Sequence, residues 1–174
     1  MTRGTAPGVG GPEAVVDLRP LRVDDAALVA EATLFNVNWT GEERVTPAVV
    51  ASDPALAHYT VLRPDRGDFG LVAEVGGRPV GVVWLLFLDA ADPGYGYVAD
   101  GVPELSVCVW PGHRGRGLGT LLLEAALAAA RDRDLDRVCL SVEAGNPARR
   151  LYRDLGFVDV EGTASETMVI RLRM

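Results

Sequence analysis

Short apolar segments alternate along the chain with stretches whose apolar residues recur at helical spacing. Apolar and β-branched residues predict strands over 15–19, 70–75, 80–88, 104–109, 137–142 and 168–172. Helical spacing predicts helices over 26–34, from 118 to 129 and over 146–155, with shorter helical pieces at 47–50 and 54–59. Gly76 and Gly77, between the second and third of these strands, are typical of a hairpin turn. The order predicts a single mixed β-sheet with helices on both faces.

The helix that begins at Leu118 has a regular amphipathic pattern and follows a glycine-rich turn. The face expected to pack on the sheet carries Leu118, Leu121, Leu122, Ala125 and Ala129. The turn before it holds Gly115, Gly117 and Gly119, and no acidic residue lies between Val109 and Thr120.

A strand, a glycine turn and a helix start together favour a phosphate site. Glycines allow close backbone approach, and a helix N-terminus offers unpaired N–H groups. Arg114 and Arg116 add positive charge. The alternative is a plain glycine-rich turn without a ligand. The glycine spacing differs from the G-x-G-x-x-G of dinucleotide sites, and the Gly-Lys-Ser/Thr of a P-loop is absent.

A second informative stretch runs from 140 to 157. Asn146 suits a helix N-cap, Pro147 the first helical position and Gly156 the C-terminal stop. The predicted helix therefore follows directly on the strand over 137–142.

These two stretches carry a family resemblance. Arg114-x-x-Gly117-x-Gly119 resembles the acyl-CoA pyrophosphate loop of the GNAT superfamily of N-acetyltransferases, and Asn146, Tyr152, Gly156 and Phe157 resemble its second signature. The resemblance is strong over about 104–158. It implies an α/β (α+β) fold, with a single mixed, centrally splayed β-sheet between helices. It also implies transfer of an acetyl group from acetyl-CoA to a primary amine by direct attack in a ternary complex.

The resemblance also implies which residues bind the donor. The strand backbone at Val107, Cys108 and Val109 is expected to hold the pantetheine arm, and the N–H of Cys108 or Val109 to stabilise negative charge on the thioester oxygen. Asn146 is expected to contact the cofactor as well as to cap a helix. The pyrophosphate is expected to bind Arg114, Gly115, Arg116, Gly117, Leu118, Gly119 and Thr120.

Two side chains are candidates for proton transfer. Glu104, where the family often places an acidic residue, is the candidate general base for the acceptor ammonium. The alternative is that Glu104 faces solvent or only orders a loop. Tyr152 matches the family position of the general acid that protonates the leaving thiolate. The alternative is an aromatic side chain that packs a helix on the sheet.

The acceptor pocket is less clearly marked. Asn38 and Trp39 follow the first helix, where the family usually shapes its acceptor pocket, and Tyr95 and Tyr97 lie on a Pro- and Gly-bearing loop that could form the opposite wall. Aromatic rings there would suit a small or aminoacyl amine. Ordinary core and loop packing is the competing interpretation.

Composition sets the remaining expectations. The chain has 174 residues and a formal net charge of −7, which argues against nonspecific nucleic-acid binding. We expect a flexible tail over 1–13, a single domain over 14–174, no membrane segment and a cytoplasmic protein that is a monomer or homodimer. Cys108 and Cys139 are expected as buried thiols, and no metal-ligand spacing is present. The competing function is a catalytically inactive acyl-CoA-binding sensor or regulatory module.

Overall fold

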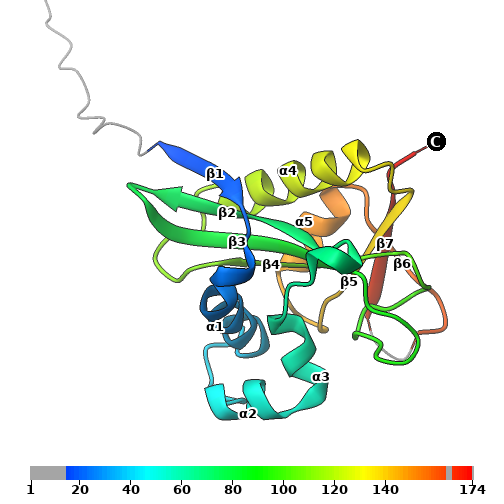
Figure 1. The fold of residues 1–174 in the computed structure, drawn as a ribbon, viewed down its shortest axis with the longest axis horizontal. Coiled ribbons are helices and arrows are strands. Elements are labelled where there is room, and N and C mark those ends of the chain that lie inside the picture. The colour runs from blue at the N-terminus through cyan, green and yellow to red at the C-terminus, as the bar shows by residue number, and fades with distance from the viewer. Residues whose placement is uncertain (1–14, 164–165, 174) are drawn as a thin grey trace, which may run out of the picture.

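The computed structural model describes residues 15–163 and 166–173, so the expected tail over 1–13 lies outside the described residues. Three short 3₁₀ turns, at Val23–Asp25, His58–Thr60 and Pro64–Arg66, complement the helices and strands (Figure 1). In chain order these elements are β1 (Val16–Pro20), α1 (Ala26–Val37), α2 (Pro47–Ser52), α3 (Pro54–Ala57), β2 (Phe69–Val75), β3 (Arg78–Leu86), β4 (Glu104–Val109), α4 (Leu118–Asp132), β5 (Arg137–Ser141), α5 (Ala148–Asp154), β6 (Val158–Asp159) and β7 (Thr167–Arg171).

The strands form one seven-stranded sheet in the order β1-β2-β3-β4-β5-β7-β6. β4 and β5 are parallel and pair only at Glu104 and Cys139, whereas the other neighbours are antiparallel. Within the described residues, the two strands therefore separate beyond this single position. The expectation of a mixed sheet with a central splay is confirmed.

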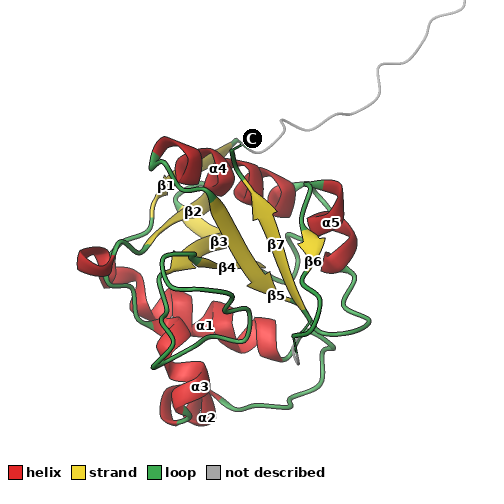
Figure 2. Ribbon diagram, turned by 90° about the vertical axis from the view of Figure 1, so that its right-hand side faces the viewer, coloured by secondary structure: helices red, strands yellow, loops and turns green. Residues whose placement is uncertain are grey.

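Helices cover both faces of the sheet. α4 and α5 lie on one face, and α1 lies on the other with α2 and α3 beyond it (Figures 1 and 2). Each face has its own apolar core, one including Leu122, Leu140 and Phe157 and the other Val29, Val82 and Trp84. Burial of these side chains fixes which face each helix covers.

The structure confirms that α4 begins at Leu118, but the predicted burial of Leu121 is wrong. Leu118 and Leu122 are buried as expected, whereas Leu121 is 38% exposed. Ala125 and Ala129 lie at the margin of the buried face. Beyond Leu118, the buried residues of α4 are Leu122, Leu123, Ala126, Leu127 and Ala130.

The other elements lie close to their predicted ranges. The hairpin turn has positive φ angles at Gly76 (58°) and Gly77 (74°), as a primed turn requires. α5 begins one residue later than predicted, with Pro147 rather than Asn146 at the N-cap position, although Asn146 Oδ1 accepts a hydrogen bond from the N–H of Ala148. Gly156 follows the end of α5 with φ 101°, as predicted for a C-terminal stop. Two-residue β6 was not predicted, because it is too short to show a period. In the described part of the chain, no helix combines the length and apolar character needed to cross a membrane.

Candidate functional site

The separation of β4 from β5 opens a cavity of about 970 Å³. Its walls come from β4, the end of β5, the start of α5, the C-terminal part of α1 and the segment that follows it. Among the predicted site residues, those that line this cavity are Trp39, Tyr95, Glu104, Val107, Cys108, Val109, Arg114, Gly119, Asn146 and Tyr152. The structure thus brings together side chains that are more than a hundred residues apart in sequence.

The glycine-rich turn leads from β4 into the N-terminus of α4. Gly115 and Gly117 have φ angles of 73° and 79°, a region that L side chains rarely adopt, and Gly117 is the N-cap of α4. Arg116 and Gly117 are exposed, and the Arg114 Nε donates to the Val109 carbonyl at 2.9 Å. This turn therefore presents backbone N–H groups, a helix N-terminus and arginine charge beside the mouth of the cavity.

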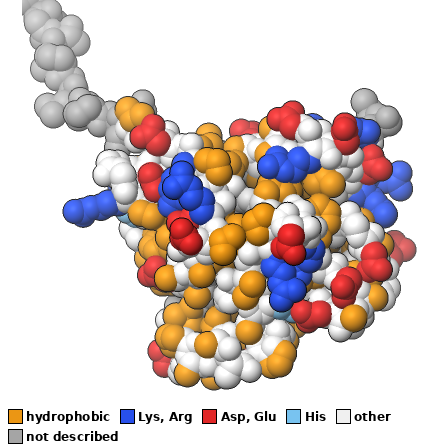
Figure 3. All heavy atoms as spheres, in the orientation of Figure 1, with side chains coloured by type: hydrophobic (Ala, Val, Ile, Leu, Met, Phe, Trp, Pro, Cys, Tyr) orange, Lys and Arg blue, Asp and Glu red, His pale blue; other side chains and the backbone are white. Residues whose placement is uncertain are grey.

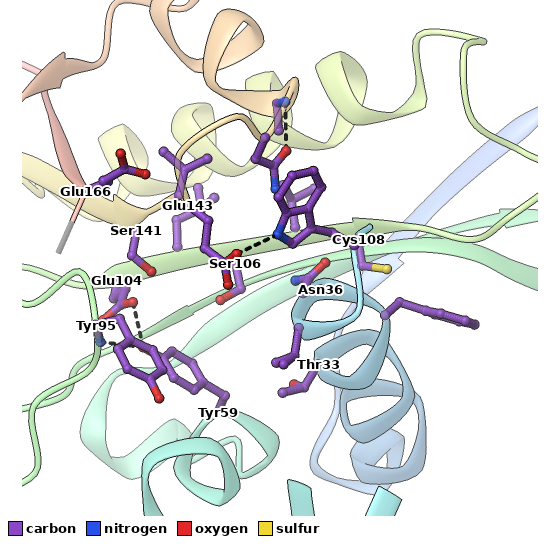
Figure 4. Close-up of a pocket in the computed structure, with 18 of the residues that line it drawn as sticks. Thr33, Asn36, Tyr59, Tyr95, Glu104, Ser106, Cys108, Ser141, Glu143 and Glu166 are labelled. Carbon is purple, nitrogen blue, oxygen red and sulfur yellow. Dashed lines mark hydrogen bonds between the residues drawn. The ribbon is translucent and has the colours of Figure 1, made fainter. Parts of the chain in front are cut away.

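Glu104 is the first residue of β4 and is only 3% exposed, so the alternative that it faces solvent is excluded. Its Oε1 accepts from the Tyr59 hydroxyl at 2.7 Å (Figure 4) and from the Gly96 N–H at 3.0 Å. Its buried Oε2 has no hydrogen-bond partner in the described structure. Burial raises the pKa of the carboxyl group, and the two donors and the nearby His58 partly offset that shift.

The loop between β3 and β4 packs closely against Glu104 and β5. A Cβ atom at Gly94 would lie 1.9 Å from Glu104 Oε2, and one at Gly96 would lie 2.5 Å from the backbone carbon of Leu140. Glycine at these two positions is therefore a steric requirement. The Gly96 N–H also means that Glu104 does order this loop, besides lining the cavity.

Tyr152 lies in α5 and is 8% exposed. Its ring meets Phe157 edge to face at 5.9 Å, so it packs the helix on the sheet, but it also lines the cavity. Burial raises the pKa of its phenol to about 12. The phenol therefore keeps its proton throughout the neutral range, whichever of the two interpretations applies.

Cys108 is an unpromising nucleophile. Burial raises the pKa of its thiol to about 12, so the reactive thiolate is scarce at neutral pH. Its backbone amide is the group available to a ligand. In the described chain, β4 beyond Glu104 pairs with β3 on one side and has no β5 partner on the other. Both cysteines are free and buried, as predicted, and the pKa of Cys139 is also raised to about 12, mainly by burial.

The acceptor-side predictions divide into two groups. Trp39 and Tyr95 line the cavity. Asn38 and Tyr97 are not among the lining residues: the Asn38 side chain binds the backbone of Val45, and the Tyr97 hydroxyl donates to Asp100 at 2.7 Å. These two residues shape the loops that carry the walls.

A polar bridge crosses between the two walls. Glu143, after β5, accepts from the Trp39 Nε1 at 2.9 Å (Figure 4) and from both terminal nitrogens of Arg44 at 2.9 and 3.1 Å. These hydrogen bonds lower the pKa of the Glu143 carboxyl group. Sequence reasoning missed Glu143 and Tyr59, since nothing local marks either as part of the site.

The face drawn in Figure 3 has no continuous basic patch, because basic side chains alternate there with acidic and apolar ones. Over residues 15–163 and 166–173, no group of three or more His, Cys, Asp or Glu side chains is arranged to hold a metal ion. The charged residues that line the cavity are Arg44, Asp53, Glu104, Arg114, Glu143 and Glu166.

Comparison with known sequences identifies related proteins. A mycothiol acetyltransferase of Beutenbergia cavernae is 41% identical over 109 residues, which are 62% of this chain and 30% of that protein. Another, of Saccharomonospora viridis, is 34% identical over 105 residues, or 60% of this chain and 26% of that protein. The chain therefore spans less than a third of these relatives. A putative [ribosomal protein bS18]-alanine N-acetyltransferase of Bacillus subtilis is 26% identical, covering 80% of this chain and 78% of that protein.

Solved structures share the fold. YncA, a putative acetyltransferase from Salmonella typhimurium determined with acetyl-CoA, aligns with a TM-score of 0.65 and 25% identity over 92% of this chain and 95% of its own. A GNAT-family acetyltransferase of Staphylococcus aureus Mu50 aligns with a TM-score of 0.68 at 14% identity, over 91% and 100% of the two chains. The family model described as the acetyltransferase (GNAT) family matches residues 33–157. The resemblance inferred from the two sequence signatures is therefore confirmed: the chain belongs to the acetyltransferase (GNAT) family.

Proposed function

We propose that this chain transfers an acetyl group from acetyl-CoA to the primary amine of a small molecule or peptide, with donor and acceptor bound together. The observation that carries the proposal is the buried carboxylate of Glu104, with one oxygen unpartnered, in a cavity that opens where β4 leaves β5. A regulatory module that only bound acyl-CoA would have no need of such a group in the cavity.

The residues present fit the donor. The unpaired edge of β4 at Val107, Cys108 and Val109 offers amide groups to an extended pantetheine arm, in the manner of an added strand. The turn from Gly115 to Thr120, with Arg114, Arg116 and the α4 N-terminus, suits a pyrophosphate. Asn146 lies on the cavity wall at the start of α5. When bound, acetyl-CoA supplies the thioester whose acetyl group is transferred.

Glu104 serves as the general base. An alkyl ammonium has a pKa of about 10, so it must lose a proton before its nitrogen can attack. The Glu104 carboxylate accepts that proton, directly or through water, and returns it to solvent after each turnover. A backbone N–H of Cys108 or Val109 stabilises the negative charge that develops on the thioester oxygen.

Tyr152 serves as the general acid. Its pKa of about 12 disfavours a lasting phenolate, so we assign the transfer of its proton to the moment at which the carbon–sulfur bond breaks. The second proton lost by the acceptor nitrogen restores the phenol, by way of solvent. The net products are the amide, the free thiol and one proton, which balances the reaction.

Calorimetric titration with acetyl-CoA, NADH and ATP is the first test, and selective binding of acetyl-CoA is expected. A panel of amines is then screened for thiol release. Because relatives are named for mycothiol and for an alanine of a ribosomal protein, the panel includes small amines and peptides with N-terminal alanine.

The variant Glu104→Gln distinguishes an acetyltransferase from a regulatory module that only binds acyl-CoA. We expect it to keep acetyl-CoA affinity, to lose about 10²-fold or more in kcat and to lose the acidic limb of the pH–rate profile. Acetyl-CoA binding without thiol release for any amine would favour the regulatory module, and no acetyl-CoA binding would refute both functions.

A further inference from the structure

Tyr59, in the short 3₁₀ turn His58–Thr60, makes a direct side-chain contact with the carboxylate of Glu104. Its hydroxyl lies 2.7 Å from Glu104 Oε1, and both groups are buried. Figure 4 shows the carboxylate beside the rings of Tyr59 and Tyr95. This contact joins the helical layer to the first residue of β4 and is absent from the proton-transfer scheme above.

The direction of the Tyr59 hydroxyl is fixed by its second contact. The backbone N–H of Tyr95 donates to the phenol oxygen at 2.7 Å, so the phenol proton is left to point at Glu104. The Tyr59 ring is stacked on Tyr95 at 6.2 Å and meets His58 edge to face at 4.5 Å. Burial and the charge of Glu104 raise the pKa of the Tyr59 phenol, so it remains a donor.

The two oxygens of Glu104 consequently differ. Oε1 already accepts from Tyr59 and from the Gly96 N–H, which occupy its two lone pairs. Oε2 has no hydrogen-bond partner among the described residues and is itself buried, against the backbone of Gly94. Because a protonated carboxyl group can still accept at Oε1, both contacts persist when Oε2 gains a proton.

We propose that Tyr59 is a positioning residue, which holds Oε1 of Glu104 and so fixes the orientation of the carboxylate that takes the proton of the acceptor amine. This inference rests on the proposed function for its last step only. Tyr59 does not exchange a proton with the substrate: it orients the carboxylate and favours its ionised form by donating a hydrogen bond to it.

Other groups face the same carboxylate and must be separated from Tyr59. His58, also on the 3₁₀ turn, lowers the pKa of Glu104 by its charge, and its Nδ1 lies 2.8 Å from Asp92. Cys139, opposite Glu104 on β5, has a thiol whose raised pKa keeps it neutral. Tyr95 contributes its backbone N–H to the phenol of Tyr59.

The variant Tyr59→Phe tests the proposal, because it removes the hydroxyl while keeping the ring contacts. The ionisation of Glu104 is followed by carbon-13 NMR of the glutamate side-chain carboxyls, with the Glu104 resonance assigned by its loss in Glu104→Gln. We expect the pKa of Glu104 to rise by about one pH unit and the acidic limb of kcat/KM to move upward by the same amount. The acetyl-CoA dissociation constant should be unchanged.

Tyr97→Phe is the matched control, since it removes a phenol hydroxyl from the neighbouring loop that donates to Asp100. We expect the Glu104 titration of this variant to match that of the wild type. His58→Gln, measured in parallel, gives the separate contribution of the imidazole.

Three outcomes judge the proposal. An unchanged Glu104 titration in a folded Tyr59→Phe variant would overturn the positioning role. A shifted titration with an unshifted rate profile would overturn the assignment of Glu104 as the proton acceptor. A shifted titration in a protein that acetylates no amine would refute the proposed function, while the hold of Tyr59 on Glu104 would stand.

Discussion

Replacement of Gly94 by alanine adds one methyl group at the closest approach of the β3–β4 loop to Glu104. The new Cβ would lie 1.9 Å from Glu104 Oε2, 2.7 Å from the Tyr59 hydroxyl and 2.8 Å from a Leu88 methyl group. Real Cβ atoms essentially never approach a neighbour within 3.0 Å. The carboxylate or the loop must therefore move by at least about 1 Å.

The magnitude of the effect follows from that displacement. Overpacking a buried site costs about 1–3 kcal/mol, which lowers the Tm by about 2–4 °C per kcal/mol in a domain of this size. A misplacement of about 1 Å in a catalytic group costs about 10²-fold in rate. We therefore expect a folded protein with kcat reduced about 10²-fold and with acetyl-CoA affinity preserved, because the three atoms nearest the new Cβ belong to Glu104, Tyr59 and Leu88 and not to the residues proposed to bind the donor.

The assay combines steady-state thiol release, calorimetry with acetyl-CoA and thermal melting. Gly76→Ala is the control, since its φ of 58° imposes a backbone cost in the β2–β3 hairpin, and no described residue beyond its two chain neighbours has an atom within 4 Å of the added methyl group. That variant should lose about 1 kcal/mol of stability and retain kcat. A Gly94→Ala enzyme with kcat within about twofold of the wild type would refute the reasoning that Oε2 must occupy this space.

Three further changes test other parts of the site. Gly117→Asp should weaken acetyl-CoA binding at least about 10²-fold by calorimetry, and Gly117→Ala separates strain at φ 79° from the added negative charge. Tyr152→Phe should lower kcat about 10²-fold at unchanged acetyl-CoA affinity, and an unaffected kcat would assign thiolate protonation to water. Glu143→Ala should raise the KM of the acceptor while changing stability by less than about 1 kcal/mol, because its partner Arg44 is exposed; an unaltered KM would show that the bridge has no role in the site.

The sequence predicted most strands and helices because their patterns are local. β4 and the start of α4 begin at the predicted residues, since a strand, a glycine turn and an amphipathic helix each have their own signal. The burial of Leu121 was wrongly predicted because a one-residue rotation of a helix changes few of its apolar spacings. The unpaired stretch of β4 was predicted only from the family resemblance. The residues of a strand do not themselves indicate which neighbouring strand is missing.

The site was predicted unevenly for the same reason. Arg114, Asn146 and Tyr152 lie in contiguous signatures, so sequence alone could propose them. Tyr59 contacts Glu104 at a sequence separation of 45, and its segment looks like an ordinary short helix. The alternatives for Glu104 could be narrowed only when its burial and its two donors were known, because those depend on three separate segments of the chain.

The single point of pairing between β4 and β5 has a consequence for the motions of the protein. The strands β1 to β4 and β5 to β7 form two ladders that share one paired position, so the backbone bonds of each ladder can open without breaking those of the other. α4 packs against β2, β3 and β4, which ties its stability to the first ladder. Amide hydrogen exchange should therefore resolve two cooperative units in the free protein. A ligand that lies along β4 and contacts β5 should make the two units exchange as one. Bound acetyl-CoA would then fill the gap between β4 and β5 and stabilise both parts of the sheet.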